Sequence, residues 1–362
     1  MPSSAKTDYA APFRGSRWVG VVARSRACPD LGMWDLLHAG PPFRGAPPAP
    51  VREAAIQALL FEGLAGDRAE AENQLGSPAR LLPAQNHGVA TPLAQVISAS
   101  MPLLVVEQGA ARAYAAVIEG PPPALRFGSA ETTCRVRLAT LATALTADVL
   151  PLLLREPTAI DAVIRIAVAA GDDCHARTGA ANEALISSLR GLGAATARVL
   201  RANPGFVLAI FMAAGMAALR THGCAVEAIG GNGIDFGVRY RGHAGWRCVP
   251  SEAPRGTRMA GLESQMPLGA IGDSVLIDFC GLGGQALAAA PLLAADWAAS
   301  LPPDALSRRA ALIDPRTGLV DPGRIVAAHA APLINLAVIG SDAGAGLIGR
   351  GCYIPPLSLF QP

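Results

Sequence analysis

A run of fourteen apolar residues, Phe206 to Leu219, constrains the fold more than any other part of the sequence. Asn203-Pro204-Gly205 precedes the run and Arg220 ends it. A membrane-spanning helix needs about 18 or more apolar residues, so this run is too short to cross a bilayer. A helix that is apolar on every side is buried in a protein. We therefore predict a core helix at 206–220, around which the rest of the chain must pack.

The spacing of apolar residues divides the chain into regions of different pattern. An early helix is predicted at 52–65, and strands are predicted at 102–107 and 113–119. From about residue 130 to 219, apolar residues recur at spacings of three and four, which indicates helices, among them one at 177–190. Strands return at 225–229, 234–240, 246–249 and 275–280, and helices follow at 284–299, 304–313 and 322–330.

This order of elements predicts a mixed α/β (α+β) protein in which two α/β domains flank or contain a small helical domain. The expected parts are an N-terminal tail, an N-terminal α/β domain, a helical domain and a C-terminal α/β domain, at 1–29, 30–125, 126–205 and 206–362.

Charge and composition exclude several kinds of chemistry. The formal net charge is +2 in 362 residues, so we expect neither nucleic acid nor a membrane as partner. Lys6 is the single lysine among 30 basic residues. A Schiff base or a P-loop lysine would have to come from Lys6, which stands in a polar N-terminal segment. Anions must therefore be bound by arginine, by backbone N–H groups or by a metal ion.

The seven cysteines form no CxxC pair, which argues against a zinc ribbon or a compact disulfide framework. The first eleven residues lack the basic and apolar pattern of a secretion signal. We therefore expect a reduced, cytoplasmic protein.

The densest group of polar residues is Gly171-Asp-Asp-Cys-His-Ala-Arg-Thr178, between two apolar helices. Asp172 and Asp173 could bind a cation or orient His175, while Arg177 could hold a carboxylate or phosphate. Alternatively, the two aspartates cap a helix and the histidine lies at the surface. The concentration of titratable groups in a chain with few charges favours a site.

Two glycine-rich segments are candidate anion loops. Gly230-Gly-Asn-Gly-Ile-Asp-Phe-Gly-Val-Arg239 contains Asn232 and Gly233, with Asp235 and Arg239 on one face of a strand. An ordinary Asn-Gly hairpin explains this segment equally well. Gly281-Leu-Gly-Gly-Gln-Ala286, with Gly283 and Gly284, matches the dinucleotide pattern G-x-G-x-x-A. We reject a Rossmann domain because no second strand follows, and retain a generic anion cradle at a helix start.

Two histidines stand beside glycine turns, in His38-Ala-Gly-Pro-Pro42 and Gln85-Asn-His87-Gly88. Such a position could expose an imidazole in a cleft, although a lone histidine is more often structural. The sequence has no GxSxG, HExxH, Walker A or EF-hand pattern.

Five segments taken together resemble one family. They are His38-Ala-Gly-Pro-Pro; Asn86-His-Gly with Ser98-x-Ser-Met-Pro; Gly171-Asp-Asp-Cys-His-x-Arg-Thr; Asn232-Gly-x-Asp-Phe-Gly-x-Arg; and Gly272-Asp-Ser with Gly281-x-Gly-Gly. In this order they are similar to the DUF1116, or YlbE-like, proteins, whose best-understood members are large subunits of bacterial oxamate carbamoyltransferase in allantoin degradation. The resemblance covers about residues 30 to 358.

The resemblance implies a mixed α/β protein with a small helical insert. It also implies phosphorolysis of oxalurate, or of a related N-carbamoyl acid, to oxamate and carbamoyl phosphate, or the reverse reaction. The expected partners are a small anionic substrate, phosphate, an FdrA-like subunit and a third, smaller subunit.

Such chemistry needs oriented anions and a stabilised carbonyl oxygen rather than a covalent nucleophile. Three groups of residues suit it, each with its own role. Acid–base catalysis and substrate orientation fall to His175, His87, Asp173 and Arg177. Anion binding falls to His38, Asn232, Gly233, Asp235, Arg239, Gly281, Gly283, Gly284 and Arg350. Mg²⁺, if used, would bind Asp172, Asp173 and Asp273.

Two other functions remain open at this point. One is a non-catalytic, ligand-binding scaffold subunit for an FdrA-like enzyme. The other is a stand-alone amidohydrolase that activates water.

Overall fold

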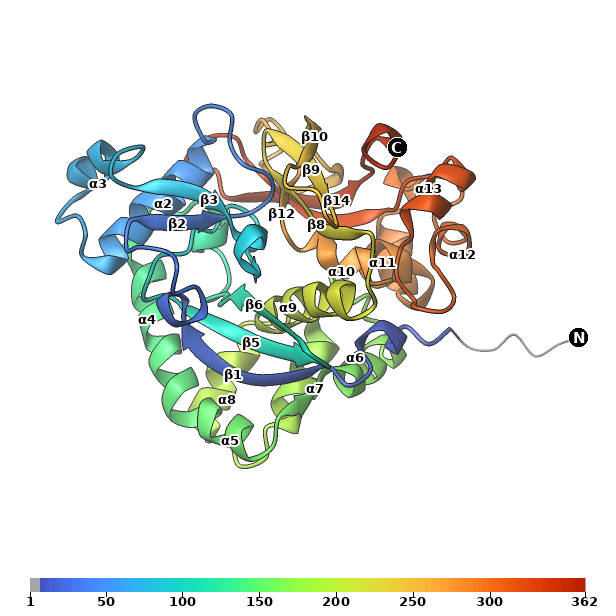
Figure 1. Cartoon of the computed structure of the whole chain (residues 1–362), viewed down its shortest axis with the longest axis horizontal. Helices are drawn as coiled ribbons and strands as arrows, with labels where there is room; N and C mark the ends of the chain where they lie inside the picture. Colours follow the sequence, from blue (N-terminus) through green and yellow to red (C-terminus); the bar gives the residue numbers. More distant parts are fainter. Residues whose placement is uncertain (1–6, 362) are drawn as a thin grey trace, which may run out of the picture.

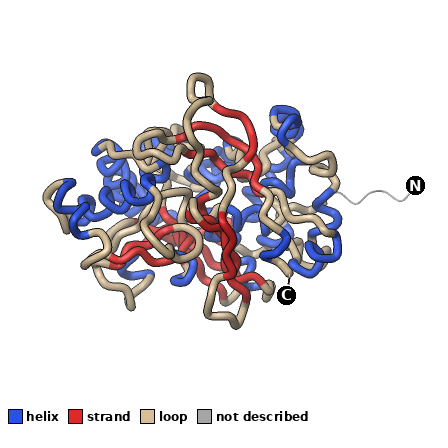
Figure 2. The backbone as a smooth tube through the Cα atoms, turned by 90° about the horizontal axis from the view of Figure 1, so that it is seen from above, coloured by secondary structure: helices blue, strands red, loops and turns tan. Residues whose placement is uncertain are grey.

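The computed structural model describes residues 7–361, in which strands run through the middle of the molecule and helices lie on both sides (Figures 1 and 2). The predicted mixed α/β class is confirmed by this architecture. Lys6 lies outside the described residues.

The first sheet has five strands in the order β4-β6-β5-β1-β7. Their bounds are Val89–Ala90, Ala111–Ala116, Pro102–Gln108, Arg17–Ala23 and Thr158–Ala159. β1 pairs antiparallel with both β5 and β7, and Trp18 on it is completely buried. Residues 17–23, expected in an N-terminal tail, are therefore an inner strand of the sheet. The seven residues form a short, nearly continuous apolar run without alternation, and such a run does not by itself identify a strand.

The predicted core helix is confirmed as α9, Phe206–Thr221. It packs against β5 and β6 on one side and against β8 (Val226–Asn232) and α10 (Val275–Phe279) on the other (Figure 1). A Cβ atom at Gly215 of α9 would lie 3.0 Å from the Leu276 carbonyl oxygen, so this glycine allows α10 to approach closely. The expected strand at 275–280 is this short helix, because a six-residue apolar run does not distinguish a buried strand from a buried helix.

Helices dominate between residues 130 and 205, as predicted. They are α4 (Thr132–Ala144), a π-helical turn (Leu145–Val149), α5 (Leu150–Arg155), α6 (Ile160–Ala169), α7 (Gly179–Ser188) and α8 (Ala194–Arg201). The continuous stretch Thr132–Arg155 has a mean hydropathy of 1.5 in its most apolar window and, by length and composition alone, could cross a membrane. One face of it, with Leu138, Leu145 and Leu153, is buried in the core.

Two further sheets form the late part of the chain (Figure 1). One has the order β10-β9-β8-β12, in which β10 is Arg247–Pro250, β9 is Asp235–Tyr240 and β12 is Ile271–Gly272. The other has the order β11-β14-β13, with bounds Arg255–Arg258, Leu347–Tyr353 and Ile334–Ile339. The sequence pattern did not predict β13 and β14.

The remaining elements complete the edges of the molecule. A two-stranded parallel sheet joins β2 (Asp35–His38) to β3 (Arg80–Pro83). The remaining helices are α1 (Arg24–Ala27), α2 (Ala49–Glu62), α3 (Arg68–Gln74), α11 (Pro291–Asp296), α12 (Arg308–Leu312) and α13 (Pro322–Ala328). Short 3₁₀ turns lie at 11–13, 84–87, 125–127, 283–289, 298–300 and 357–359. The domain boundaries near 125 and 205 stay predictions.

Candidate active site

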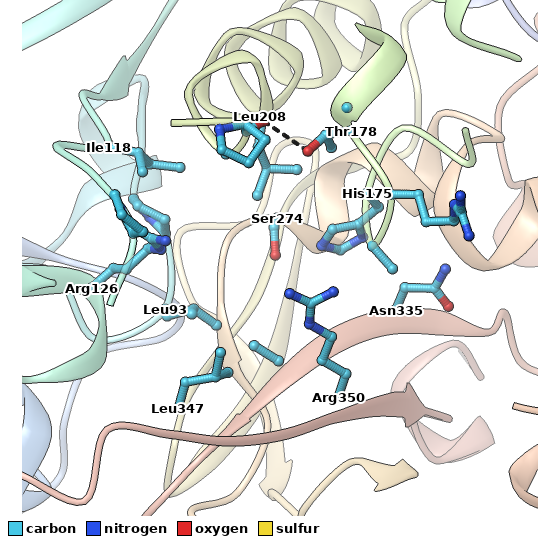
Figure 3. Close-up of a pocket in the computed structure, with 18 of the residues that line it drawn as sticks. Leu93, Ile118, Arg126, His175, Thr178, Leu208, Ser274, Asn335, Leu347 and Arg350 are labelled. Atoms are coloured by element: carbon cyan, nitrogen blue, oxygen red, sulfur yellow. Dashed lines mark hydrogen bonds between the residues drawn. The ribbon is translucent and has the colours of Figure 1, made fainter. Parts of the chain in front are cut away.

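A cavity of about 720 Å³ lies where distant parts of the chain meet (Figure 3). Its walls come from the α6–α7 loop, the start of α9, the segment 118–127 and the β13–β14 hairpin. This volume suits a small-molecule ligand. Four of the predicted site residues line it: Asp172, His175, Arg177 and Arg350.

His175 is held in the cavity wall by a buried aspartate that the sequence analysis did not single out. Its Nδ1 lies 2.8 Å from Asp278 Oδ2. Asp278 Oδ1 also accepts hydrogen bonds from Gly284 N, at 2.7 Å, and Asn335 N, at 3.1 Å. Because Nδ1 faces Asp278, Nε2 is the ring nitrogen left to meet a ligand.

The electrostatic surroundings of His175 favour its protonated form. Burial lowers the pKa of the imidazole, but the charge and hydrogen bond of Asp278, together with the charge of Asp173, outweigh burial and raise the pKa above its usual value. An imidazole of this kind can donate a proton near neutral pH.

Asp172 and Asp173 shape the α6–α7 loop. Asp173 is completely buried and accepts hydrogen bonds from Ala176 N at 3.1 Å, Arg177 N at 2.7 Å and Asn335 Nδ2 at 2.7 Å. Asp172 accepts from Ala181 N at 2.9 Å, in the first turn of α7. Asp172 thus bonds the first turn of α7, as the capping interpretation predicts, whereas Asp173 bonds its own loop before that helix begins. His175, which that interpretation placed at the surface, is buried.

A magnesium site at these aspartates is not supported. Asp172 and Asp173 are occupied by the N–H donors of their own loop, and Asp273 binds other donors elsewhere. Among residues 7–361, no group of three or more His, Cys, Asp and Glu side chains is placed to hold a metal ion.

Two arginines bring positive charge to the cavity from opposite sides (Figure 3). Arg350 extends from β14 toward Ser274 and His175, and Arg126 lies across the cavity from His175. Arg126 Nη1 donates to the Gly120 carbonyl oxygen at 2.6 Å. Burial lowers the pKa of Arg126 to about 10, which leaves the guanidinium charged at neutral pH. Two cations facing one cavity indicate an anionic ligand.

Asp273 lies outside the cavity and joins separate loops. It accepts hydrogen bonds from Gly40 N at 2.9 Å, Gln85 Nε2 at 2.6 Å and Thr91 N at 2.8 Å. Burial raises the pKa of this carboxyl to about 7 against the effect of these hydrogen bonds. Its neighbour Ser274 lines the cavity, so Asp273 fixes the backbone beside the site rather than the site itself.

Two other motif residues of this region, His38 and Asn232, also form hydrogen bonds with backbone groups. His38 is buried, its Nδ1 bonds the Ala39 carbonyl oxygen at 2.8 Å, and burial lowers its pKa to about 4. Asn232 Nδ2 donates to the Pro41 carbonyl oxygen at 2.9 Å, and its Oδ1 accepts from the backbone N–H of Asp235 at 2.8 Å.

Gly233, in the turn before β9, and Arg239, on β9, also have structural roles. Gly233 has φ +90°, which favours glycine. Arg239 Nη1 donates to Asn86 Oδ1 at 2.7 Å. Neither residue lines the cavity.

The glycine segment 281–284 supports the site from behind. Gly283 N donates to the Asp173 carbonyl oxygen at 2.8 Å, and Gly284 N donates to Asp278 Oδ1 at 2.7 Å. The Gly281 carbonyl oxygen accepts from Arg309. The N–H groups expected to bind an anion from a ligand therefore bind the protein's own oxygens in this structure.

His87 lies in a second, smaller cavity of about 340 Å³, with Tyr114 and Arg220. Burial lowers the pKa of His87. His87 and His175 thus lie in different cavities, whereas the sequence offered both as acid–base candidates without favouring either.

Sequence reasoning missed several residues at the cavity. They are Asp278, Asn335, Arg126, Asn203 and Ser274, the last quoted only as part of a motif. Asp278 carried a usable signal, because it is the lone acid in the apolar run Val275–Cys280. A single arginine or asparagine in a loop gives no comparable signal.

Comparisons with known proteins agree along most of the chain. The family model described as oxamate carbamoyltransferase subunit AllG matches residues 79–274. The *Escherichia coli* K12 protein named oxamate carbamoyltransferase subunit AllG is 29% identical, covering 95% of this chain and 92% of its own. The uncharacterized protein YahG of the same organism is 28% identical, covering 95% and 80%. A crystal structure of a conserved protein of unknown function from *Enterococcus faecalis* V583 has the same fold, with a TM-score of 0.82, 24% identity and coverage of 98% and 94%.

Proposed function

The chain belongs to the family of oxamate carbamoyltransferase subunit AllG, and from that premise we propose that it is a carbamoyltransferase subunit whose cavity binds oxalurate and oxamate, or a related small N-carbamoyl acid and its product. The observation that carries the proposal is the His175–Asp278 pair facing Arg350 in one cavity. The pair supplies a positioned proton, and the arginine supplies a partner for a carboxylate.

The chemistry follows from what each group can do. Arg350 and Arg126 hold the carboxylate of oxalurate, and an oxygen of phosphate attacks the carbamoyl carbon. The bond from that carbon to the oxamate nitrogen breaks, and His175 Nε2 delivers a proton to the leaving nitrogen. The proton lost by phosphate returns to His175, so the products are carbamoyl phosphate and oxamate. In the reverse direction His175 Nε2 takes a proton from the oxamate nitrogen.

Apolar side chains also line the cavity. Leu93, Ile118 and Leu208 line the cavity beside the polar groups, which limits access of water to the carbamoyl group. This supports transfer to phosphate over hydrolysis. We further propose that the chain works in the cytoplasm, with an FdrA-like subunit and a third, smaller subunit.

The test is carbamoyl phosphate formation from oxalurate and phosphate by the chain assembled with its partner subunits. Arg350→Met should weaken oxalurate and oxamate binding about 100-fold, because it removes a charged hydrogen-bond partner of the carboxylate. Arg255→Met is the matched control, since this exposed arginine pairs only at the surface with Glu252.

His175→Gln should lower the transfer rate about 100-fold while leaving oxamate binding within a fewfold of wild type. If both His175→Gln and Arg350→Met leave the complex fully active, the cavity is not the site of transfer. The chain would then be the scaffold subunit.

A further inference from the structure

Asn203, at the corner between α8 and α9, places a polar side chain at the cavity that the proposed reaction does not use. The residue is 3% exposed and lines the cavity. Its backbone is fixed on both sides, because its N–H donates to the Leu200 carbonyl oxygen and its carbonyl oxygen accepts from Phe206 N. The side chain is therefore held in one place by the helices that flank it.

The orientation of the Asn203 amide is also fixed. Nδ2 donates to the Ile118 carbonyl oxygen at 2.7 Å, and a carbonyl oxygen can only accept. Oδ1 must therefore be the other atom, and within residues 7–361 no donor reaches it. A buried acceptor without a donor is destabilising, and a ligand N–H in the cavity would satisfy it.

The surroundings of Oδ1 show which kind of ligand would fit. Gly205 lines the cavity beside it, and a Cβ atom there would lie 3.8 Å from Asn203 Oδ1 and 3.9 Å from Arg126 Nη2. The missing side chain leaves room for a group of about methyl size between this acceptor and this cation, with Ile118 Cγ2 3.7 Å away on the third side. The complementary ligand has an N–H donor next to an anionic oxygen.

We propose that Asn203 is the specificity-determining residue that recognises the amide N–H of an α-carboxyamide whose carboxylate is bound by Arg126. In such a molecule the carboxylate oxygen and the amide nitrogen lie about 3 Å apart, from standard bond lengths, which suits the corner at Gly205. This assignment rests on the proposed function and deepens it, since it selects carboxyamides over 2-oxo acids of the same shape.

Oxamate and pyruvate test the proposal directly, because they have the same shape and differ by NH₂ in place of CH₃. Binding of each to the full chain, alone and in the enzyme complex, is measured by titration calorimetry. The wild type should bind oxamate about tenfold more tightly than pyruvate, the effect of one buried hydrogen bond. This comparison needs no variant.

Asn203→Leu should reduce the ratio of the two affinities to about one. Asn182→Leu is the matched control, because Asn182 is equally buried, donates from Nδ2 to the Leu200 carbonyl oxygen and lies outside the cavity. A merely structural role for Asn203 would weaken both ligands alike and leave the ratio unchanged.

Two results would overturn the inference while leaving the proposed function intact. One is a wild type that binds both ligands within twofold, and the other is an Asn203→Leu variant that keeps the wild-type ratio. Failure of the wild-type complex to bind either ligand would overturn the proposed function and this inference together.

Discussion

Asp273 and Asp278 stand five residues apart and are both completely buried, yet they hold different kinds of partner. Asp273 accepts from two backbone N–H groups and from Gln85, and none of these three donor residues lines the cavity. Asp278 accepts from two backbone N–H groups and from His175, whose ring lines the cavity. One carboxylate joins parts of the fold, and the other holds a side chain that lines the cavity.

The difference teaches how to interpret a buried acid near a site. Burial and a raised pKa are common to both groups, so neither property separates structure from function. The separating property is whether one partner has a second polar atom that faces a cavity. His175 has one in Nε2, and the partners of Asp273 have none that line the cavity.

The largest effect is expected from Asp273→Asn. An amide group at this position turns one oxygen into a donor that faces an N–H donor, so the free energy of unfolding should fall by about 3 kcal/mol. Urea unfolding measures the change. The folded pKa, about 7, lies above the unfolded value, so the wild-type contribution is complete below about pH 4 and declines as pH rises through 7. The difference from the variant should therefore be larger at pH 5 than at pH 8.

Asp278→Asn should fold with a smaller loss, of about 1 kcal/mol, because the new amide can donate to His175 Nδ1 while its oxygen keeps both backbone bonds. The histidine then carries its proton on Nε2 as a neutral ring and loses the charge that favours protonation. Carbamoyl transfer by the complex should fall about 100-fold. Equal losses of stability in the two variants would show that the two carboxylates do not differ as described.

A third measurement follows the histidine itself. In Asp278→Asn the pKa of His175 should fall below its ordinary value, because burial lowers it and the main opposing charge is gone. NMR titration of the imidazole in wild type and variant reports the change. In the wild type the raised pKa adds stability below about pH 6.5 that is lost as pH rises through the folded pKa. The difference in free energy of unfolding between wild type and variant should therefore be larger at pH 6 than at pH 9.

The smallest effect is expected from Arg239→Met. The Asn86 side chain holds the Arg239 guanidinium, and Arg239 does not line the cavity, so oxamate affinity should change by less than twofold. A tenfold loss of oxamate affinity would show instead that Arg239 binds the anion, as its motif predicts.

How much of the fold the sequence predicts depends on the length and evenness of each apolar run. α9 is predicted because its whole surface is apolar over fourteen residues, and β5 and β6 because two short apolar runs flank Gly109. α10 is mistaken for a strand because its few residues are buried on all sides and show no periodicity. β1 is missed because its partners, β5 and β7, lie far along the chain.

The site is predicted where titratable groups cluster in sequence and is missed where they meet only in space. The segment 171–178 places His175 and Arg177 at the cavity, and the sequence alone supports that. Arg126 and Asn203 reach the cavity through the packing of loops that no local pattern connects. The glycines at 283 and 284 are predicted as an anion cradle, but Gly284 N donates to the protein's own Asp278 carboxylate and Gly283 N donates to the Asp173 carbonyl oxygen.

The β13–β14 hairpin carries groups that the proposed reaction assigns to ligand binding and to proton transfer. Ala337 pairs with Arg350, and Asn335 pairs with Cys352. The same two strands therefore carry Arg350 and Asn335, whose side-chain amide donates to Asp173 and whose backbone N–H donates to Asp278. A displacement of this hairpin would therefore move two groups together: Arg350, which is proposed to bind the carboxylate, and Asn335, which bonds the Asp278 that holds His175. A neighbouring subunit that contacts the outer edge of this sheet would thus change both the affinity for the ligand and the rate of transfer by moving this one hairpin.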